Sequence, residues 1–187
     1  EEGELTQNSK GKGWFELVSD PWRPVPSRGG HLSQNPGITD RTDIDERLDV
    51  AVFTTSQFIK SHYLEGAPTL EITTQSECES FDLCVALSKV SEDLRETIQL
   101  STGFLRVRGK DGIKHTKRKI SLQPICAVIN PKEFLRLSIA GSSWPAIGIN
   151  PGTSTYNCGP PSSNCLVITV KVNLDDSKLE ILPLLGQ

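Results

Sequence analysis

Three histidines, His31, His62 and His115, are the side chains of this chain best suited to acid–base chemistry near neutral pH. A Ser-His-Asp hydrolase also needs a serine on a strained turn, usually within Gly-x-Ser-x-Gly. That pattern does not occur, and the nearest approach, Ala-Gly-Ser-Ser-Trp at residues 140–144, lacks the second glycine. His62 and His115 sit among polar residues, which is typical of surface groups. The sequence therefore predicts no catalytic triad within this chain.

The five cysteines do not have the spacing of a metal site. Cys78 and Cys84 are six residues apart, and Cys158 and Cys165 enclose a Gly-Pro-Pro-Ser-Ser-Asn loop, so neither pair forms the Cys-x-x-Cys knuckle of structural zinc. We expect no bound metal and no cofactor. Cys84 and Cys126 fit buried strand positions, where a free thiol behaves as a small apolar group. Cys158 and Cys165 could either form a disulfide or remain two free thiols.

An acidic run lies between residues 40 and 49. Its spacing lacks the glycine and the terminal glutamate of an EF-hand loop, and Arg41 and Arg47 interrupt it. We therefore expect an ion-paired turn that leads into a strand, rather than a calcium site. The acidic residues are Asp40, Asp43, Asp45, Glu46 and Asp49.

A basic stretch covers residues 106–119 and has Asp111-Gly112 at its centre. The simpler interpretation is a solvated excursion between two strands. The alternative is a partner-binding patch. The basic residues are Arg106, Arg108, Lys110, Lys114, Lys117, Arg118 and Lys119.

Composition excludes several functional classes. Twenty Lys and Arg balance 23 Asp and Glu, so the basic field of a nucleic-acid-binding protein is absent. No apolar run approaches the roughly 18 residues of a membrane span, and we expect no membrane partner. A mid-sized chain with an odd number of cysteines favours a cytoplasmic protein.

The ends of the chain suggest a piece of something longer. The first residue is Glu, no Met occurs anywhere, and no signal segment is present. Residues 1–14 are expected to be a linker or a cut end, and residues 15–187 a single domain.

Strand signals run through most of the chain, with Pro and Gly between them. Residues 81–90 are the clearest, because Phe81, Leu83, Val85 and Leu87 recur at a period of two. In residues 48–55 we expect Leu48, Val50 and Val52 to share one face, and in residues 69–74 Leu70 and Ile72. Residues 91–100 are expected to be a loop that leads into a strand. Further strands are predicted at residues 104–108, 120–122, 134–140, 166–172 and 179–182.

One half-buried face per strand predicts two sheets packed face to face, or a barrel. Eight or more short strands with long connections favour an all-β, two-sheet jelly-roll sandwich, which resembles galactose-binding-like domains. Two-residue hairpins are not apparent, so we expect the connections to cross between the sheets.

Six motifs in one order resemble a known family. Residues 19–30, Ser-Asp-Pro-Trp-Arg-Pro-Val-Pro-Ser-Arg-Gly-Gly, resemble the first segment of the X-Pro dipeptidyl-peptidase C-terminal domain, which also closes cocaine-esterase-like (CocE/NonD) hydrolases. The other five motifs lie within residues 40–55, 66–70, 81–90, 102–106 and 134–150. The resemblance covers about residues 15–185. It departs from the family pattern at residues 126–134, at residues 145–150 and in the loop between Cys158 and Cys165.

This resemblance implies a function in a larger enzyme. The family combines an α/β-hydrolase catalytic domain, which carries the Ser, Asp and His triad, with a helical cap and this jelly roll at the C-terminus. The implied partner is therefore the catalytic domain of the same polypeptide, where the serine is acylated and then freed by water. In relatives the segment after the Gly-Gly pair approaches the acyl pocket, so the implied pocket-lining residues are His31, Leu32, Ser33 and Gln34.

Two other functions compete with this one. Jelly rolls often bind carbohydrates, which would require a platform of exposed aromatic side chains, and the chain has only 3 Trp, 2 Tyr and 6 Phe. The second competitor is an autonomous interaction module that uses the basic stretch.

Overall fold

A computed structural model describes residues 2–6, 11–155 and 158–182. The strands are β1 (Glu2–Glu4), β2 (Trp14–Ser19), β3 (Thr39–Asp40), β4 (Val50–Thr54), β5 (His62–Ser76), β6 (Phe81–Val90), β7 (Thr97–Val107), β8 (Thr116–Ser121), β9 (Ile125–Ile129), β10 (Phe134–Ala140) and β11 (Ile168–Leu182). Two short helices, α1 (Thr42–Asp45) and the 3-10 helix η1 (Gly109–Asp111), complete the described elements. Neither of these described helices has the length to cross a bilayer.

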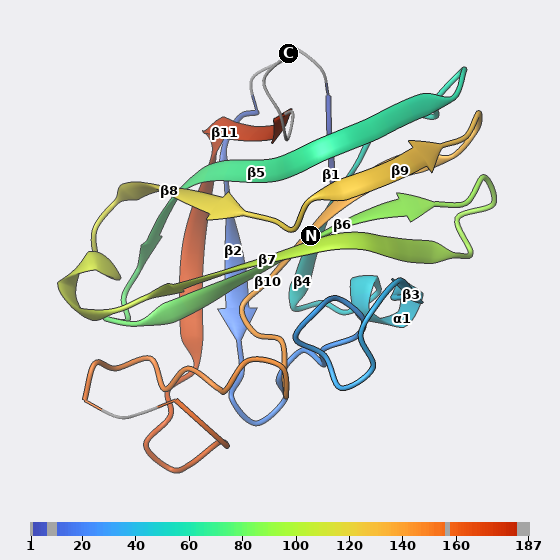
Figure 1. Cartoon of the computed structure of the whole chain (residues 1–187). Helices are drawn as coiled ribbons and strands as arrows, with labels where there is room; N and C mark the ends of the chain where they lie inside the picture. Colours follow the sequence, from blue (N-terminus) through green and yellow to red (C-terminus); the bar gives the residue numbers. More distant parts are fainter. Residues whose placement is uncertain (1, 7–10, 156–157, 183–187) are drawn as a thin grey trace.

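The strands form two sheets packed as a sandwich (Figure 1). The six-stranded sheet has the order β1-β4-β10-β6-β7-β3, and the second sheet has the order β2-β11-β5-β8, with β9 paired to β5. The chain changes sheet in three of its connections: from β4 to β5, from β5 to β6 and from β10 to β11. The all-β sandwich and its crossing connections are thus as the sequence predicts.

The main core lies between the sheets. Alternating residues of β6 supply its centre, and Leu83 and Leu87 are fully buried there. Leu70 and Ile72 of β5 and Val170 of β11 face them from the second sheet. The bounds of β6 and β10 match the predicted ones, and in β6 the alternation at a period of two marks them.

The start of β4 differs from the prediction. Leu48 lies outside the strand and is completely exposed, because residues 46–49 form a turn in which Arg47 binds Asp49. From Val50 onward the strand is buried on both faces, with Phe53 in the main core and Val52 in a second, smaller core. The expectation of one half-buried face is wrong here because a further layer of chain covers the outside of this sheet.

Two other expectations need correction. Cys126 is exposed rather than buried, because it lies on the outward face of β9. The two strands predicted at residues 166–172 and 179–182 are one strand, β11, whose pairing with β5 changes register between Asn173 and Lys178. Leu166 precedes this strand and is largely exposed.

Truncating a core leucine tests the sandwich. Leu83→Ala and Leu87→Ala should each lower the free energy of unfolding by about 2–5 kcal/mol, through lost transfer energy and the cavity left behind. Leu48→Ala is the matched control and should leave it unchanged, since Leu48 is fully exposed. Urea denaturation measures the free energy of unfolding of the three variants. Equal losses for Leu48→Ala and Leu83→Ala would contradict the placement of Leu83 in the core between the sheets.

Candidate functional site

The outer face of the six-stranded sheet is covered by two segments, residues 20–47 and 141–152, which we call the covering layer. Val25 and Ile44 of this layer are buried against Val50, Val52 and Ala140 of the sheet. They form a small apolar core separate from the main one. The covering layer therefore buries the outer face of the sheet at β4 and at the end of β10.

The two segments of the layer are bonded to each other. Pro26 forms a parallel bridge with Trp144. The Trp144 N–H donates to the Val25 carbonyl at 2.8 Å, and the Ser27 N–H donates to the Trp144 carbonyl at 2.7 Å. The Val25 N–H donates to the Ser142 hydroxyl at 2.8 Å. Residues about 120 positions apart in the chain are thus held together.

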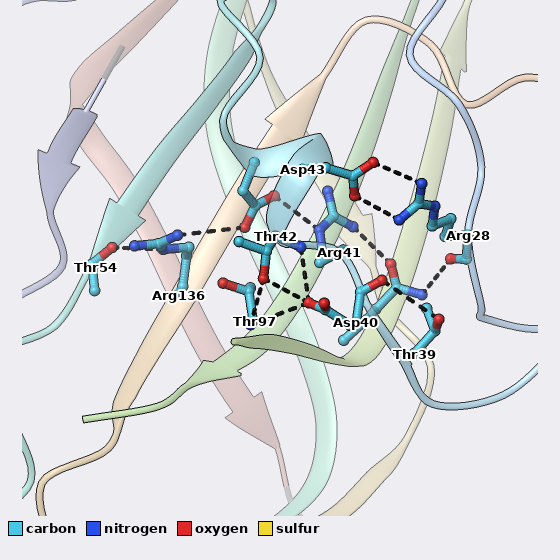
Figure 2. A network of polar contacts seen from close by, with 11 residues as sticks. Arg28, Thr39, Asp40, Arg41, Thr42, Asp43, Thr54, Thr97 and Arg136 are labelled. Atoms are coloured by element: carbon cyan, nitrogen blue, oxygen red, sulfur yellow. Dashed lines mark hydrogen bonds and ion pairs between the residues drawn. The ribbon is translucent and has the colours of Figure 1, made fainter. Parts of the chain in front are cut away.

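A buried ion pair within the first segment contacts the sheet through Gln99 and Arg136 (Figure 2). Arg41 Nε donates to Asp45 Oδ1 at 2.9 Å, and both side chains are almost fully buried. Arg41 Nη1 donates to Gln99 Oε1 of β7 at 2.7 Å, and Gln99 Nε2 donates to the Arg28 carbonyl at 2.7 Å. Arg136 of β10 lies 3.8 Å from the second oxygen of Asp45.

Exposed contacts extend this network around α1. Arg28 binds Asp43 through two hydrogen bonds of 2.6 and 2.7 Å (Figure 2). Asp40 accepts hydrogen bonds from the hydroxyl and backbone N–H of Thr42, which lower the pKa of the Asp40 carboxyl. The backbone N–H of Thr97 in β7 also donates to Asp40. The prediction of an ion-paired turn is confirmed.

A second arginine–carboxylate contact holds the other segment of the layer. Arg106 of β7 binds Asp82 of β6 through two hydrogen bonds of 2.8 and 2.6 Å, and Asp82 raises the pKa of Arg106. Asn150 Nδ2 donates to Asp82 at 2.8 Å, and Arg106 donates to the Gly148 carbonyl. Arg106 therefore has a structural contact inside the domain.

Apart from Arg118, which is partly buried over the Phe81 ring and donates to Thr74, the rest of the basic stretch is a solvated excursion, as the simpler interpretation predicts. It contains the end of β7, η1 and the start of β8. Lys114 pairs with Asp111, and Lys117 pairs with Glu71. These exposed pairs contribute little to stability.

The segment after the Gly-Gly pair forms a closed loop. Gly29 and Gly30 have φ values of +55° and +67°, which side chains rarely adopt. A Cβ on Gly29 would come within 2.5 Å of the Gly37 carbonyl oxygen. Two reciprocal backbone hydrogen bonds of 2.9 and 3.0 Å join Gly30 to Gly37, so residues 31–36 project as a loop from a fixed base.

This loop borders a cleft of about 80 Å³. His31, Leu32 and Ser33 of the loop line it, together with Ser142, Ser143, Ala146 and Ile147 of the second segment. Gln34 is exposed and does not line the cleft. The sequence did not identify Ser142, Ser143, Ala146 and Ile147 as part of this site, although they lie within the last of the six family-like motifs.

The cleft lacks an activated nucleophile. Burial raises the pKa of the Cys84 thiol on its floor well above the ordinary value, and the nearby Asp82 raises it further. The Ser142 hydroxyl accepts a backbone hydrogen bond. In the described parts of the chain, no histidine side chain is hydrogen-bonded to a serine, and no group of three or more potential metal ligands gathers.

The cysteines and histidines that the sequence singled out beyond the cleft do not form a reactive group. Cys158 and Cys165 are free thiols rather than a disulfide. His62 and His115 are exposed, as predicted, and stack loosely on Phe58 and Trp14 with ring centroids 5.3 and 5.2 Å apart.

The buried ion pair gives a testable prediction. Asp45→Asn should lower the free energy of unfolding by about 3–5 kcal/mol, because it leaves the buried Arg41 charge without its carboxylate. Asp43→Asn, the matched change in the same helix, removes an exposed pair and should cost at most about 1 kcal/mol. Chemical denaturation of both variants measures the difference. Similar losses for the two would show that the Arg41–Asp45 pair does not anchor the layer.

Comparison with known proteins identifies the domain. Residues 2–178 match the family model of the X-Pro dipeptidyl-peptidase C-terminal non-catalytic domain. A search of curated proteins found no match.

Solved structures share the fold. An aminopeptidase from a marine sediment archaeon, Thaumarchaeota archaeon, is 19% identical with a TM-score of 0.79 over 96% of this chain. An α-amino acid ester hydrolase is 18% identical with a TM-score of 0.74 over 90%, and a CocE/NonD family hydrolase from Staphylococcus aureus is 14% identical with a TM-score of 0.57 over 92%. This chain spans 34%, 32% and 33% of those three chains. With the family model matching nearly its whole length, the chain belongs to the X-Pro dipeptidyl-peptidase C-terminal non-catalytic domain family.

Proposed function

We propose that this chain is the C-terminal domain of a serine hydrolase and packs through its covering layer on the α/β-hydrolase catalytic domain of the same polypeptide. In this arrangement the domain stabilises the catalytic domain, and the loop at residues 31–36 helps to line the acyl pocket. Family membership supports a non-catalytic role in a hydrolase, and the chain spans about a third of each hydrolase that shares its fold.

The apolar surface of the covering layer carries this proposal. Trp22, Leu32, Ile38 and Leu48 are at least half exposed, and all four belong to the layer or to the turns that border it. The buried ion pair and the bonds to Trp144 hold their backbone in place. Apolar side chains held outward on an ordered segment are typical of a surface that another domain covers.

The loop at residues 31–36 supplies the contact with substrate. Its base is fixed by Gly30 and Gly37, whereas Leu32 stands half-exposed beside the cleft. A fixed base and an exposed apolar tip let the loop present Leu32 to a neighbouring pocket without being ordered on binding. Leu32 would make an apolar contact with the acyl group of the substrate.

A carbohydrate-binding function has less support. The exposed aromatic side chains are dispersed, with Trp14 on β2, Trp22 in the covering layer and Tyr63 at the start of β5. Sugar rings bind on aromatic faces that lie together, and these three side chains belong to different parts of the sandwich. The described residues therefore offer no shared aromatic platform.

Substitution of Leu32 in the full-length enzyme tests the proposed role. Leu32→Ala should change KM or the preference between small and large acyl groups by roughly five- to tenfold, the scale of about 1 kcal/mol of apolar contact. The melting temperature should stay the same, because Leu32 is half exposed. Val18→Ala, on the outward face of β2, is the control and should not alter kinetics. If Leu32→Ala has unchanged kinetics with acyl groups of different size, the loop does not line the acyl pocket.

A further inference from the structure

Arg41 has one donor group that its ion pair does not use. Its Nε donates to Asp45 and its Nη1 donates to Gln99, whereas Nη2 makes no hydrogen bond to any described residue (Figure 2). The second oxygen of Asp45 does not accept from Nη2, because that oxygen has no hydrogen-bond partner. The Arg41 side chain is only 9% exposed, but Nη2 is not fully enclosed and Arg41 lines the cleft. This donor therefore lies at the wall of the cleft beside the loop at residues 31–36.

The charge of Arg41 also acts inside the cleft. Burial is the main reason that the pKa of the Cys84 thiol on the cleft floor is raised, and the charge of Arg41 opposes that rise. Two N–H groups of a guanidinium at this wall can donate to an acceptor that enters the cleft.

The charged groups around the cleft favour an anion. The buried network contains two guanidinium groups, those of Arg41 and Arg136, for the single carboxylate of Asp45. Arg28 also lines the cleft, and its charge is balanced by Asp43 outside it. The described residues that line the cleft include no Asp and no Glu. An anion that enters therefore meets positive charge and no carboxylate.

The remaining lining combines hydroxyl groups with an apolar surface. Ser142 Oγ accepts a hydrogen bond from the Val25 N–H, so its own proton is available for a further acceptor. The cleft volume of about 80 Å³ has room for roughly five water-sized groups, which limits a ligand to a short chain. The apolar lining residues include Val25, Ala86, Phe104, Ala140 and Ile147.

We propose that this cleft binds the anion of a short-chain carboxylic acid, whose carboxylate accepts hydrogen bonds from Arg41 Nη2 and whose alkyl chain contacts the apolar lining. Hydrogen bonds between a guanidinium and a carboxylate are charge-assisted and stronger than neutral ones. Inorganic phosphate has the charge but no alkyl group, so it does not use the apolar lining. Hydrolysis of an acyl ester or amide releases a carboxylic acid, and this link to turnover rests on the proposed function, whereas the binding itself does not.

NMR titration of the isotope-labelled chain with sodium butyrate tests the binding. Butyrate should shift the Arg41 Nε–H signal and the backbone amides of Ser142, Ser143 and Ile147, with a Kd on the order of 1–10 mM. Butyramide has the same alkyl chain without the charge and should bind at least about tenfold more weakly. Phosphate should also bind more weakly than butyrate, because it makes no apolar contact.

A pair of charge variants locates the site. Ser143→Glu places a carboxylate in the lining and should raise the Kd for butyrate at least about fivefold through like-charge repulsion. Ser61→Glu makes the same change at an exposed position in the turn before β5 and should leave the Kd unchanged. Circular dichroism and the melting temperature check that both variants are folded. If Ser143→Glu does not fold, the comparison of butyrate with butyramide decides.

Three results would overturn the proposal. The first is an Arg41 Nε–H signal that butyrate does not shift, and the second is a Kd for butyramide or phosphate equal to that for butyrate. The third is an equal Kd for butyrate in folded Ser143→Glu and Ser61→Glu. The kinetics of Leu32→Ala do not depend on these outcomes, so failure of this proposal and failure of the proposed function are distinguishable.

Discussion

The arrangement of the covering layer depends on the buried contact between Arg41 and Asp45. Removing two charges from water costs free energy, and here hydrogen bonds from Arg41 to Asp45 and Gln99, with Arg136 nearby, offset that cost. The pair links α1 to β7 and β10, so the segment before β4 lies flat on the sheet. As a result, β4 and the second half of β10 are buried on both faces, whereas an open sandwich would leave one face of each strand exposed.

Because the layer is fixed, its surface has a defined shape. The loop at residues 31–36 projects from a base closed by Gly30 and Gly37, and Gly29 is needed where a side chain would strike the Gly37 carbonyl. The covering layer therefore holds its exposed apolar side chains, Trp22, Leu32 and Ile38, on an ordered backbone over the six-stranded sheet.

The sequence predicts the parts of this structure that depend on local patterning. Alternation at a period of two predicts the limits of β6, and the acidic run interrupted by Arg41 and Arg47 indicates an ion-paired turn. The local sequence does not reveal that Arg41 also donates a hydrogen bond to Gln99, which lies 58 residues further along the chain. The cleft residues of the second segment, Ser142, Ser143, Ala146 and Ile147, were missed for the same reason, since this segment is held at the cleft by the pairing of Trp144 with the distant Val25 and Ser27. The apolar run in β4 was assigned one buried face because nothing local reveals a covering layer.

Hydrogen exchange of residues 28–40 tests the central claim most directly, with the isolated chain compared with the full-length polypeptide. Backbone amides at the tip of the loop, around Leu32, lack partners in this domain and should exchange quickly in the isolated chain. If the covering layer packs on the catalytic domain, these amides should exchange markedly more slowly in the full-length protein, whereas those of the outer strand face around Val18 should not change. Equal exchange at Leu32 in both forms would contradict the docking of the covering layer.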